Sequence, residues 1–355
     1  MKKILTKIIV CSLAFCMVGC GKNGTAEPAS VSSSAAAEIT TESVSEMEEN
    51  SHYPITLTDQ GGRTVVIEKE PEKLVSCYYI STSLLIALDL DEKMVGIENG
   101  AEKRKLYQEA SKGLLELPGV GTAKEFDIEG CAALQPDLVI LPLRLKEAAA
   151  TLEELDIPVL LVNPESGADQ LEMINLVAAA TDKWERAAEL KNFISSQGVM
   201  LKKKLENAEP KRVYLSSNSS MLSTAGKKMY QNSLIELAGG ENVAAEIEDT
   251  YWAEVDYEQI LAWNPDYFIL AADAKYSVDD VLKDEALAKC SAIMNNRVYK
   301  MPSDIESWDS PVPGSILGSV WLADILHPEE ISEEESNQII EEFYEKFYNF
   351  KYQAK

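Results

Sequence analysis

Tyrosine, tryptophan, hydroxyl and arginine side chains gather in the segments that follow predicted strands of this sequence. In parallel α/β sheets such segments lie at the carboxyl ends of the strands, where ligands are usually bound. The segments are YYIST (78–82), GTA (121–123), PLR (142–144), SSNSSMLSTAG (216–226), AAD (271–273) and PSDIESWDSP (302–311). They predict a small-molecule site formed by loops from both halves of the chain.

Three kinds of side chain are candidates for ligand contact. Aromatic rings offer apolar faces, hydroxyls can donate hydrogen bonds, and Arg144 can fork to a carboxylate, a phosphate or another oxyanion. The predicted ligand-binding residues are Tyr78, Tyr79, Ser81, Thr82, Thr122, Arg144, Met221, Ser223, Thr224, Tyr230, Trp252 and Trp308. Each aromatic could instead belong to the core, and Arg144 could be a surface cation. Direct ligation of iron or haem by Tyr78, Tyr79 or Tyr230 is also open.

The sequence offers little for binding a bare metal ion or for catalysis. Its histidines are His52 and His327, so no histidine-rich cage for zinc or manganese is expected. Beyond residue 20, the cysteines are Cys77, Cys131 and Cys290, which predict neither a disulfide framework nor a cluster site. No G-x-S-x-G elbow or P-loop occurs. We therefore predict no catalytic residue, no metal site and no resident cofactor.

A repeated phrase indicates how these loops are positioned. DIEGCAALQPDLVIL (127–141) and DYEQILAWNPDYFIL (256–270) share Asp, Glu, Ala, Pro, Asp, Ile and Leu at equivalent places. Each phrase predicts a capping Asp, a short helix, a Pro-Asp corner and a buried strand. Cys131 aligns with Ile260, which indicates a core position. Two copies predict two similar α/β lobes with largely parallel sheets.

The N-terminus predicts export. Lysines and a short apolar run end at MVGC, which has the form of a secretory signal, and the residues before Cys20 resemble a bacterial lipobox. We predict a signal peptide over 1–19, a lipid anchor on Cys20 and a disordered tether over 20–52, which is rich in Ser, Ala, Glu and Thr. The net charge of −26 argues against nucleic acid as a partner.

The segment 182–209 predicts a long helix between the lobes. Apolar residues recur at helical spacing, and Asp182 with Glu185 has the spacing of a capping box. We predict an N-terminal lobe over 53–166, a helical connection over 167–209 that includes this helix, and a C-terminal lobe over 210–355. A single helical crossing predicts a stiff pair of lobes.

The chain resembles the substrate-binding lipoproteins of bacterial ABC importers, in the class that carries iron–siderophore complexes, haem and cobalamin. The resemblance covers 53–348 and rests on GTAKEFDIEGCAALQPDLVIL, STAGKKMYQNSLIELAGGENVA, DYEQILAWNPDYFIL and SWDSPVPGSILGSVWLADILHPE. It implies two α/β lobes bridged by one long helix, with the ligand in the cleft between them. It also implies a monomer that is not an enzyme and that works with a permease dimer and ATPase subunits.

The same resemblance assigns roles within the repeat. It implies that Glu129 and Glu258 dock the two lobes onto arginines of the two permease subunits. The implied cargo is an iron–siderophore or related metal chelate, with a corrinoid or haem as the alternative. A subunit that presents its ligand to a sensor, or a chelatase-type enzyme, would be the minor alternatives.

Overall fold

The computed structural model describes residues 53–248, 250 and 252–353. The predicted signal peptide, Cys20 and the tether lie outside the described residues. Within the described part of the chain, no helix has both the length and the apolar character needed to cross a membrane.

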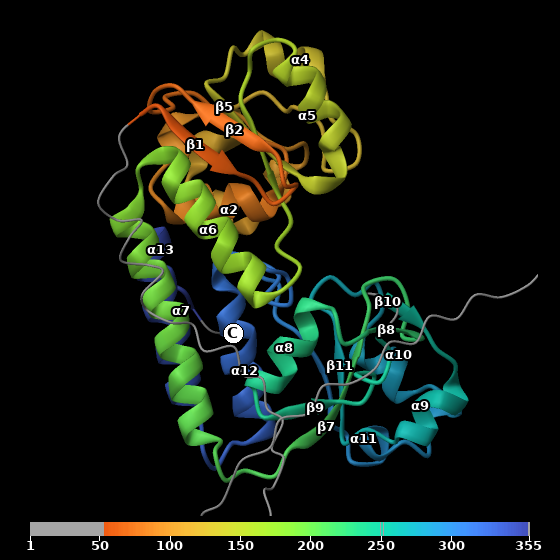
Figure 1. Cartoon of the computed structure of the whole chain (residues 1–355). Helices are drawn as coiled ribbons and strands as arrows, with labels where there is room; N and C mark the ends of the chain where they lie inside the picture. Colours follow the sequence, from red (N-terminus) through yellow and green to blue (C-terminus); the bar gives the residue numbers. More distant parts are fainter. Residues whose placement is uncertain (1–52, 249, 251, 354–355) are drawn as a thin grey trace, which may run out of the picture. The chain divides into compact units, whose positions relative to one another are not determined.

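The first lobe, which carries the labels β1, β2, β5, α4 and α5 in Figure 1, is built on a four-stranded parallel sheet with the strand order β4-β3-β5-β6. Its strands are β3 (Leu74–Ser76), β4 (Met94–Gly96), β5 (Leu138–Pro142) and β6 (Val159–Val162), preceded by the antiparallel hairpin of β1 (Ile55–Thr58) and β2 (Thr64–Ile67). Its helices are α2 (Tyr79–Ala87), α3 (Lys105–Ala110), α4 (Ile128–Ala133) and α5 (Lys146–Glu153). Strands β3, β5 and β6 are buried along their whole length and are apolar except for Ser76, because both faces of the sheet are covered.

The second lobe has a larger sheet with the order β10-β8-β7-β11-β12, in which β9 also pairs with β7. The strands are β7 (Lys211–Ser216), β8 (Ser223–Ala225), β9 (Gly240–Asn242), β10 (Trp252–Glu254), β11 (Tyr267–Leu270) and β12 (Val298–Lys300). The helices are α8 (Tyr230–Leu237), α9 (Tyr257–Trp263), α10 (Val278–Leu282), α11 (Ser291–Met294), α12 (Ile316–Leu326) and α13 (Glu333–Tyr348). Strands β7, β9, β11 and β12 are parallel, whereas β8 runs antiparallel to both β7 and β10.

The connection between the sheets contains two consecutive helices, α6 (Gly167–Thr181) and α7 (Trp184–Lys204). The expected long helix is α7, whose 21 residues extend for roughly 32 Å. The expected capping box at its start is wrong. Asp182 has a left-handed φ of 54° and ends α6, and Lys183 precedes α7 without a side-chain cap.

The repeated phrases form matching structures in the two lobes. Asp127 accepts a hydrogen bond from the Gly130 amide at 2.9 Å, and Asp256 accepts one from the Gln259 amide at 2.7 Å. Both predicted helix caps are therefore confirmed. At the corners, Asp137 accepts from the amides of residues 72 and 73, and Asp266 accepts from the amide of residue 212. Each aspartate thereby ties its corner to a neighbouring segment of the same lobe.

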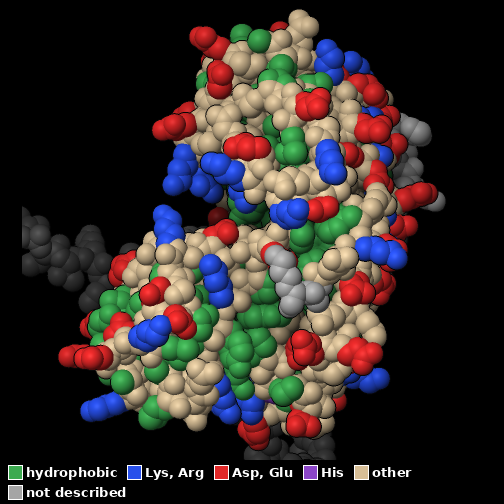
Figure 2. Space-filling view, turned by 180° about the vertical axis from the view of Figure 1, so that it is seen from behind, with side chains coloured by type: hydrophobic (Ala, Val, Ile, Leu, Met, Phe, Trp, Pro, Cys, Tyr) green, Lys and Arg blue, Asp and Glu red, His purple; other side chains and the backbone are tan. Residues whose placement is uncertain are grey.

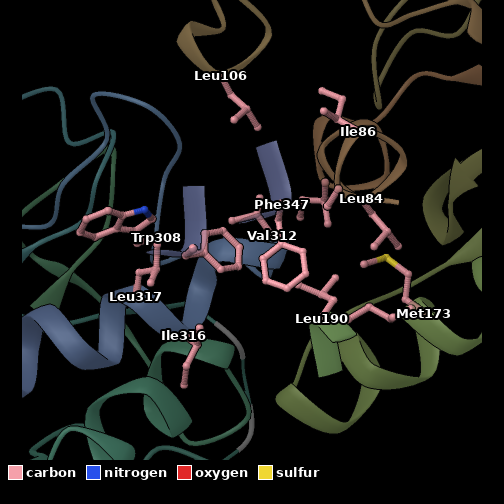
Figure 3. Close-up of a cluster of buried hydrophobic side chains, with 14 of the residues drawn as sticks. Leu84, Ile86, Leu106, Met173, Leu190, Trp308, Val312, Ile316, Leu317 and Phe347 are labelled. Carbon is pink, nitrogen blue, oxygen red and sulfur yellow. The ribbon is translucent and has the colours of Figure 1, made fainter. Parts of the chain in front are cut away.

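One apolar cluster runs from the first lobe into the second (Figure 3). It combines Leu84 of α2 and Met173 of α6 with Trp308, Leu317 of α12 and Phe347 of α13. Figure 3 shows these side chains converging from segments that are far apart in sequence. The two lobes therefore share part of their core, and each sheet also packs against a smaller cluster of its own.

Candidate functional site

A cavity of about 370 Å³ lies between loops of the two lobes. Its lining consists of Tyr78, Tyr79, Ile80, Arg144, Pro164, Glu165, Asn218, Met229, Tyr230, Gln231, Trp252, Asp309, Ser310 and Pro311. On the face drawn in Figure 2, Lys and Arg side chains lie on both sides of the hollow between the lobes. The volume is within the range of ligand pockets, toward its lower end.

The first lobe contributes an aromatic pair and one cation. Strand β3 ends at Ser76, and helix α2 begins at Tyr79, so Tyr78 and Tyr79 stand at the carboxyl end of the sheet. Their rings meet edge to face with centroids 5.6 Å apart. Arg144 lies in the turn after β5, and its guanidinium carbon is 5.8 Å from the centroid of the Tyr78 ring.

Arg144 is the cation of this cavity, and it is exposed. It forms no ion pair with any residue of the described ranges. Burial raises the pKa of the Tyr78 phenol, and the nearby Arg144 opposes that rise. The guanidinium therefore has hydrogen-bond donors to offer to a ligand with negative charge.

The second lobe contributes polar groups from α8 and from the loop after β12. The Tyr79 hydroxyl donates to Ser310 Oγ at 2.9 Å and so links the two sides of the cavity. Burial raises the pKa of Tyr79 and of Tyr230 to about 12, so both phenols stay protonated at neutral pH. Trp252 of β10 is 38% exposed at the edge of the cavity.

Gln231 and Asp309 form a buried polar pair on the cavity wall. Gln231 Nε2 donates to the backbone carbonyl of Asp309 at 2.7 Å, and the Asp309 carboxylate accepts from the Ala272 amide at 2.9 Å. Burial raises the pKa of the Asp309 carboxyl to about 6. Neither residue is among those predicted from the sequence, although Asp309 lies in the predicted loop segment 302–311.

Five of the predicted ligand-binding residues line the cavity, namely Tyr78, Tyr79, Arg144, Tyr230 and Trp252. The structure places the other seven elsewhere. Ser81 and Thr82 lie on the buried side of α2, where Ser81 Oγ is 2.8 Å from Ser76 Oγ and Thr82 donates to Glu98 at 2.7 Å. Thr122 is exposed, and its hydroxyl accepts from two amides of its own turn.

The remaining four residues pack or form hydrogen bonds within the second lobe instead of lining the cavity. Met221 packs against the smaller cluster of that lobe, and Ser223 is buried in β8. Thr224 donates to the Leu215 carbonyl at 2.7 Å. Trp308 points away from the cavity, and its Nε1 donates to the Tyr344 hydroxyl at 2.8 Å. Trp308 and its neighbour Asp309 lie in a turn in which the Ser310 amide donates to the Ser307 carbonyl at 3.0 Å, and of the two only Asp309 lines the cavity.

Glu129 and Glu258 occupy equivalent positions in the two lobes. Each is exposed in the first turn of its helix, two residues after the capping aspartate. Cys77, Cys131 and Cys290 are buried free thiols, and His327 is buried at the end of α12 with Nε2 3.0 Å from the Gly239 carbonyl oxygen. No group of His, Cys, Asp or Glu in the described part of the chain is arranged to hold a metal ion.

Comparisons with known proteins agree with this architecture. A family model described as periplasmic binding protein matches residues 74–305. The molybdate-binding protein MolA of Haemophilus influenzae is 26% identical over 321 residues, which cover 83% of this chain and 91% of that protein. The ABC transporter substrate-binding lipoprotein YvrC of Bacillus subtilis is 26% identical over 79% of this chain and 88% of its own length.

A more limited match involves the vitamin B12-binding protein of Salmonella choleraesuis, which is 28% identical over 44% of this chain and 59% of that protein. Among solved structures, MolA bound to molybdate superposes with a TM-score of 0.74 at 24% identity. The superposition covers 84% of this chain and 99% of the MolA chain.

Proposed function

Because this chain belongs to the periplasmic binding protein family, we propose that its cavity captures a metal chelate of the iron–siderophore type for delivery to a permease. The coarser function is that of the extracytoplasmic substrate-binding component of an ABC importer, which works with permease and ATPase partners. The relatives in this family are solute-binding proteins rather than enzymes.

The observation that carries the proposal is the exposed Arg144 guanidinium beside the aromatic wall. A metal chelate with anionic oxygens could accept hydrogen bonds from Arg144, while its organic ligand packs against Tyr78, Tyr79 and Trp252. A volume of 370 Å³ corresponds to roughly a dozen water molecules at about 30 Å³ each. The space favours a compact chelate, or the metal-bearing part of a larger one.

A molybdate-type oxyanion is the second candidate, because the relative MolA is a molybdate-binding protein. It would use Arg144 and leave the aromatic wall partly unused. A corrinoid or haem would extend well outside the cavity, so we rank it below the metal chelate and the oxyanion as a candidate ligand.

The test is a titration of tryptophan fluorescence, since Trp252 lines the cavity. Iron(III) chelates, molybdate, cobalamin and haem would be added separately to the purified protein. We expect quenching by at least one compact iron(III) chelate and none by free iron, zinc or manganese. Tight binding of a bare metal ion with no response to any chelate would contradict the proposal.

Arg144→Ala should weaken binding by on the order of a hundredfold, because it removes the charge-assisted hydrogen bonds that the ligand would accept from the guanidinium. Arg144→Lys should recover only part of the loss, since an ammonium lacks the forked geometry. Lys146→Ala is the matched control, because Lys146 is an exposed cation two residues away. An equal loss in the control would mean that only the general charge of this turn matters.

We also propose that Glu129 and Glu258 dock the lobes on the permease and that a lipid on Cys20 anchors the chain. Two equivalent exposed carboxylates suit the two equivalent subunits of a two-fold permease. The anchor is supported by the MVGC sequence and by the description of YvrC as a lipoprotein. If Cys20→Ser leaves the protein equally processed and equally membrane-bound, the anchor is wrong.

A further inference from the structure

The wall of the cavity contributed by the second lobe carries an unsatisfied hydrogen-bond acceptor. Gln231 is only 7% exposed, and its Oε1 accepts no hydrogen bond from any residue in the described ranges. The amide cannot simply be reversed. Reversal would place Oε1 against the Asp309 carbonyl, which now accepts from Nε2 at 2.7 Å, and two acceptors repel each other.

The two tyrosine hydroxyls near this wall have other partners. The Tyr79 hydroxyl donates to Ser310, and the Tyr230 hydroxyl interacts with Ser315. The Asp309 carboxylate is itself an acceptor, held by the Ala272 amide. Gln231 and Asp309 thus place two acceptors on this wall, which Asn218, Ser310 and Trp252 also line. The cation among the described lining residues is Arg144 of the opposite lobe.

We infer that the cargo carries N–H or O–H groups as well as negative charge, and that Gln231 with Asp309 selects for these donors. The inference rests on the proposed function and specifies the chemistry of its ligand class. The anionic oxygens of the cargo face Arg144, and a donor faces the opposite wall. We place the donor against Gln231 Oε1, because the Gln231 side chain lines the cavity. A cargo without donors leaves that buried acceptor unpaired, which lowers its affinity.

The experiment compares matched ligands that differ in donor groups. The first pair is the iron(III) complexes of 2,3-dihydroxybenzamide, which has N–H groups, and of its N,N-dimethyl analogue, which has none. The second pair is hydrogenphosphate and sulfate at about pH 8, two tetrahedral dianions of which only the first carries an O–H. Affinities are measured by fluorescence or calorimetry on the wild-type protein.

In each pair that binds, we expect the donor-bearing member to bind more tightly by on the order of tenfold. Gln231→Met keeps the length of the side chain but removes both amide atoms, and it should bring this ratio close to one. Gln338→Met is the matched control, because Gln338 is exposed on α13. It should leave the ratio unchanged.

Two results would overturn the inference while leaving the proposed function intact. One is equal affinity of the wild-type protein for both members of every pair that binds. The other is a Gln231→Met protein that keeps the full preference. The wild-type comparison stands by itself if the variant fails to fold. If no iron(III) chelate and no oxyanion binds the wild-type protein, the proposed function fails and this inference fails with it.

Discussion

The two lobes are alike where they carry the repeated phrase and different where they line the cavity. In both, a capping aspartate opens a short helix, an exposed glutamate follows in its first turn, and an aspartate ties down the corner before a buried strand. At the cavity, the first lobe supplies the cation and a tyrosine pair, whereas the second supplies Gln231 and Asp309. A symmetric partner favours repeated features, and an asymmetric ligand favours divergent ones.

The largest effect should come from removing the repeated glutamates together. Glu129→Ala with Glu258→Ala should abolish ligand-stimulated ATPase activity with the permease, because losing both charged contacts weakens docking at both ends. Ligand affinity of the purified protein should be unchanged. The exposed pair Glu147→Ala with Glu285→Ala is the control. Weaker ligand binding with intact stimulation would place the repeated glutamates in the cleft instead.

A second contrast concerns two buried glutamates. Glu98 in the first lobe accepts hydrogen bonds from Thr82 at 2.7 Å and from Tyr107 at 2.6 Å. Glu306, in the loop after β12, is 8% exposed, and neither of its oxygens has a hydrogen-bond partner in the described part of the chain. Burial raises the pKa of Glu306 to about 8.

Glu306 should therefore make the protein less stable as the pH rises. Its pKa is higher in the folded state than in the unfolded state, so its stabilising contribution is complete below about pH 4.5 and is lost as the pH approaches 8. Each tenfold difference in the acid dissociation constant between the folded and unfolded states changes the free energy of unfolding by about 1.4 kcal/mol. The total loss of unfolding free energy therefore reaches several kcal/mol. Glu306→Gln should flatten this pH dependence in chemical denaturation, and the exposed control Glu334→Gln should not. An unchanged slope for Glu306→Gln would mean that the carboxyl ionises without penalty.

The helix caps test the similarity of the lobes on a smaller scale. Asp127→Ala and Asp256→Ala should each lower the free energy of unfolding by about 1 kcal/mol, because each leaves a first-turn amide without its acceptor. Chemical denaturation of both single variants and of the double variant is the measurement. Markedly unequal losses would show that one of the repeated helices matters more to stability than the other.

The smallest effect should be the change in dimensions on ligand binding. The lobes share an apolar cluster, and the Tyr348 hydroxyl of α13 donates to the Ser83 carbonyl of α2 at 3.3 Å, so closure would disturb packed side chains. We expect the radius of gyration from X-ray scattering to change by about 1 Å or less when a binding chelate is added. A larger decrease would reveal a hinge between the lobes.

The sequence predicted best what depends on neighbouring residues. Strand β5, strand β11 and the caps at Asp127 and Asp256 follow from apolar runs, turn residues and spacing. It predicted less well which way a side chain faces. Helix α2 is buried after its first residue, so Ser81 and Thr82 have no free side to offer, which their types do not reveal. Asp309 and Gln231 line the cavity only because a loop and a helix far apart in sequence meet there.

The apolar cluster shared by the lobes also bears on how the chain folds. Leu84 and Met173 pack in the same cluster as Leu317 and Phe347, so much of the first lobe's interior is completed by residues near the end of the chain. If separated, each half would expose its part of this shared cluster. We therefore expect one cooperative unfolding transition rather than two, and no stable product from a gene fragment that encodes a single lobe. Exchange of one lobe between homologues would require exchange of the matching residues of α12 and α13 as well.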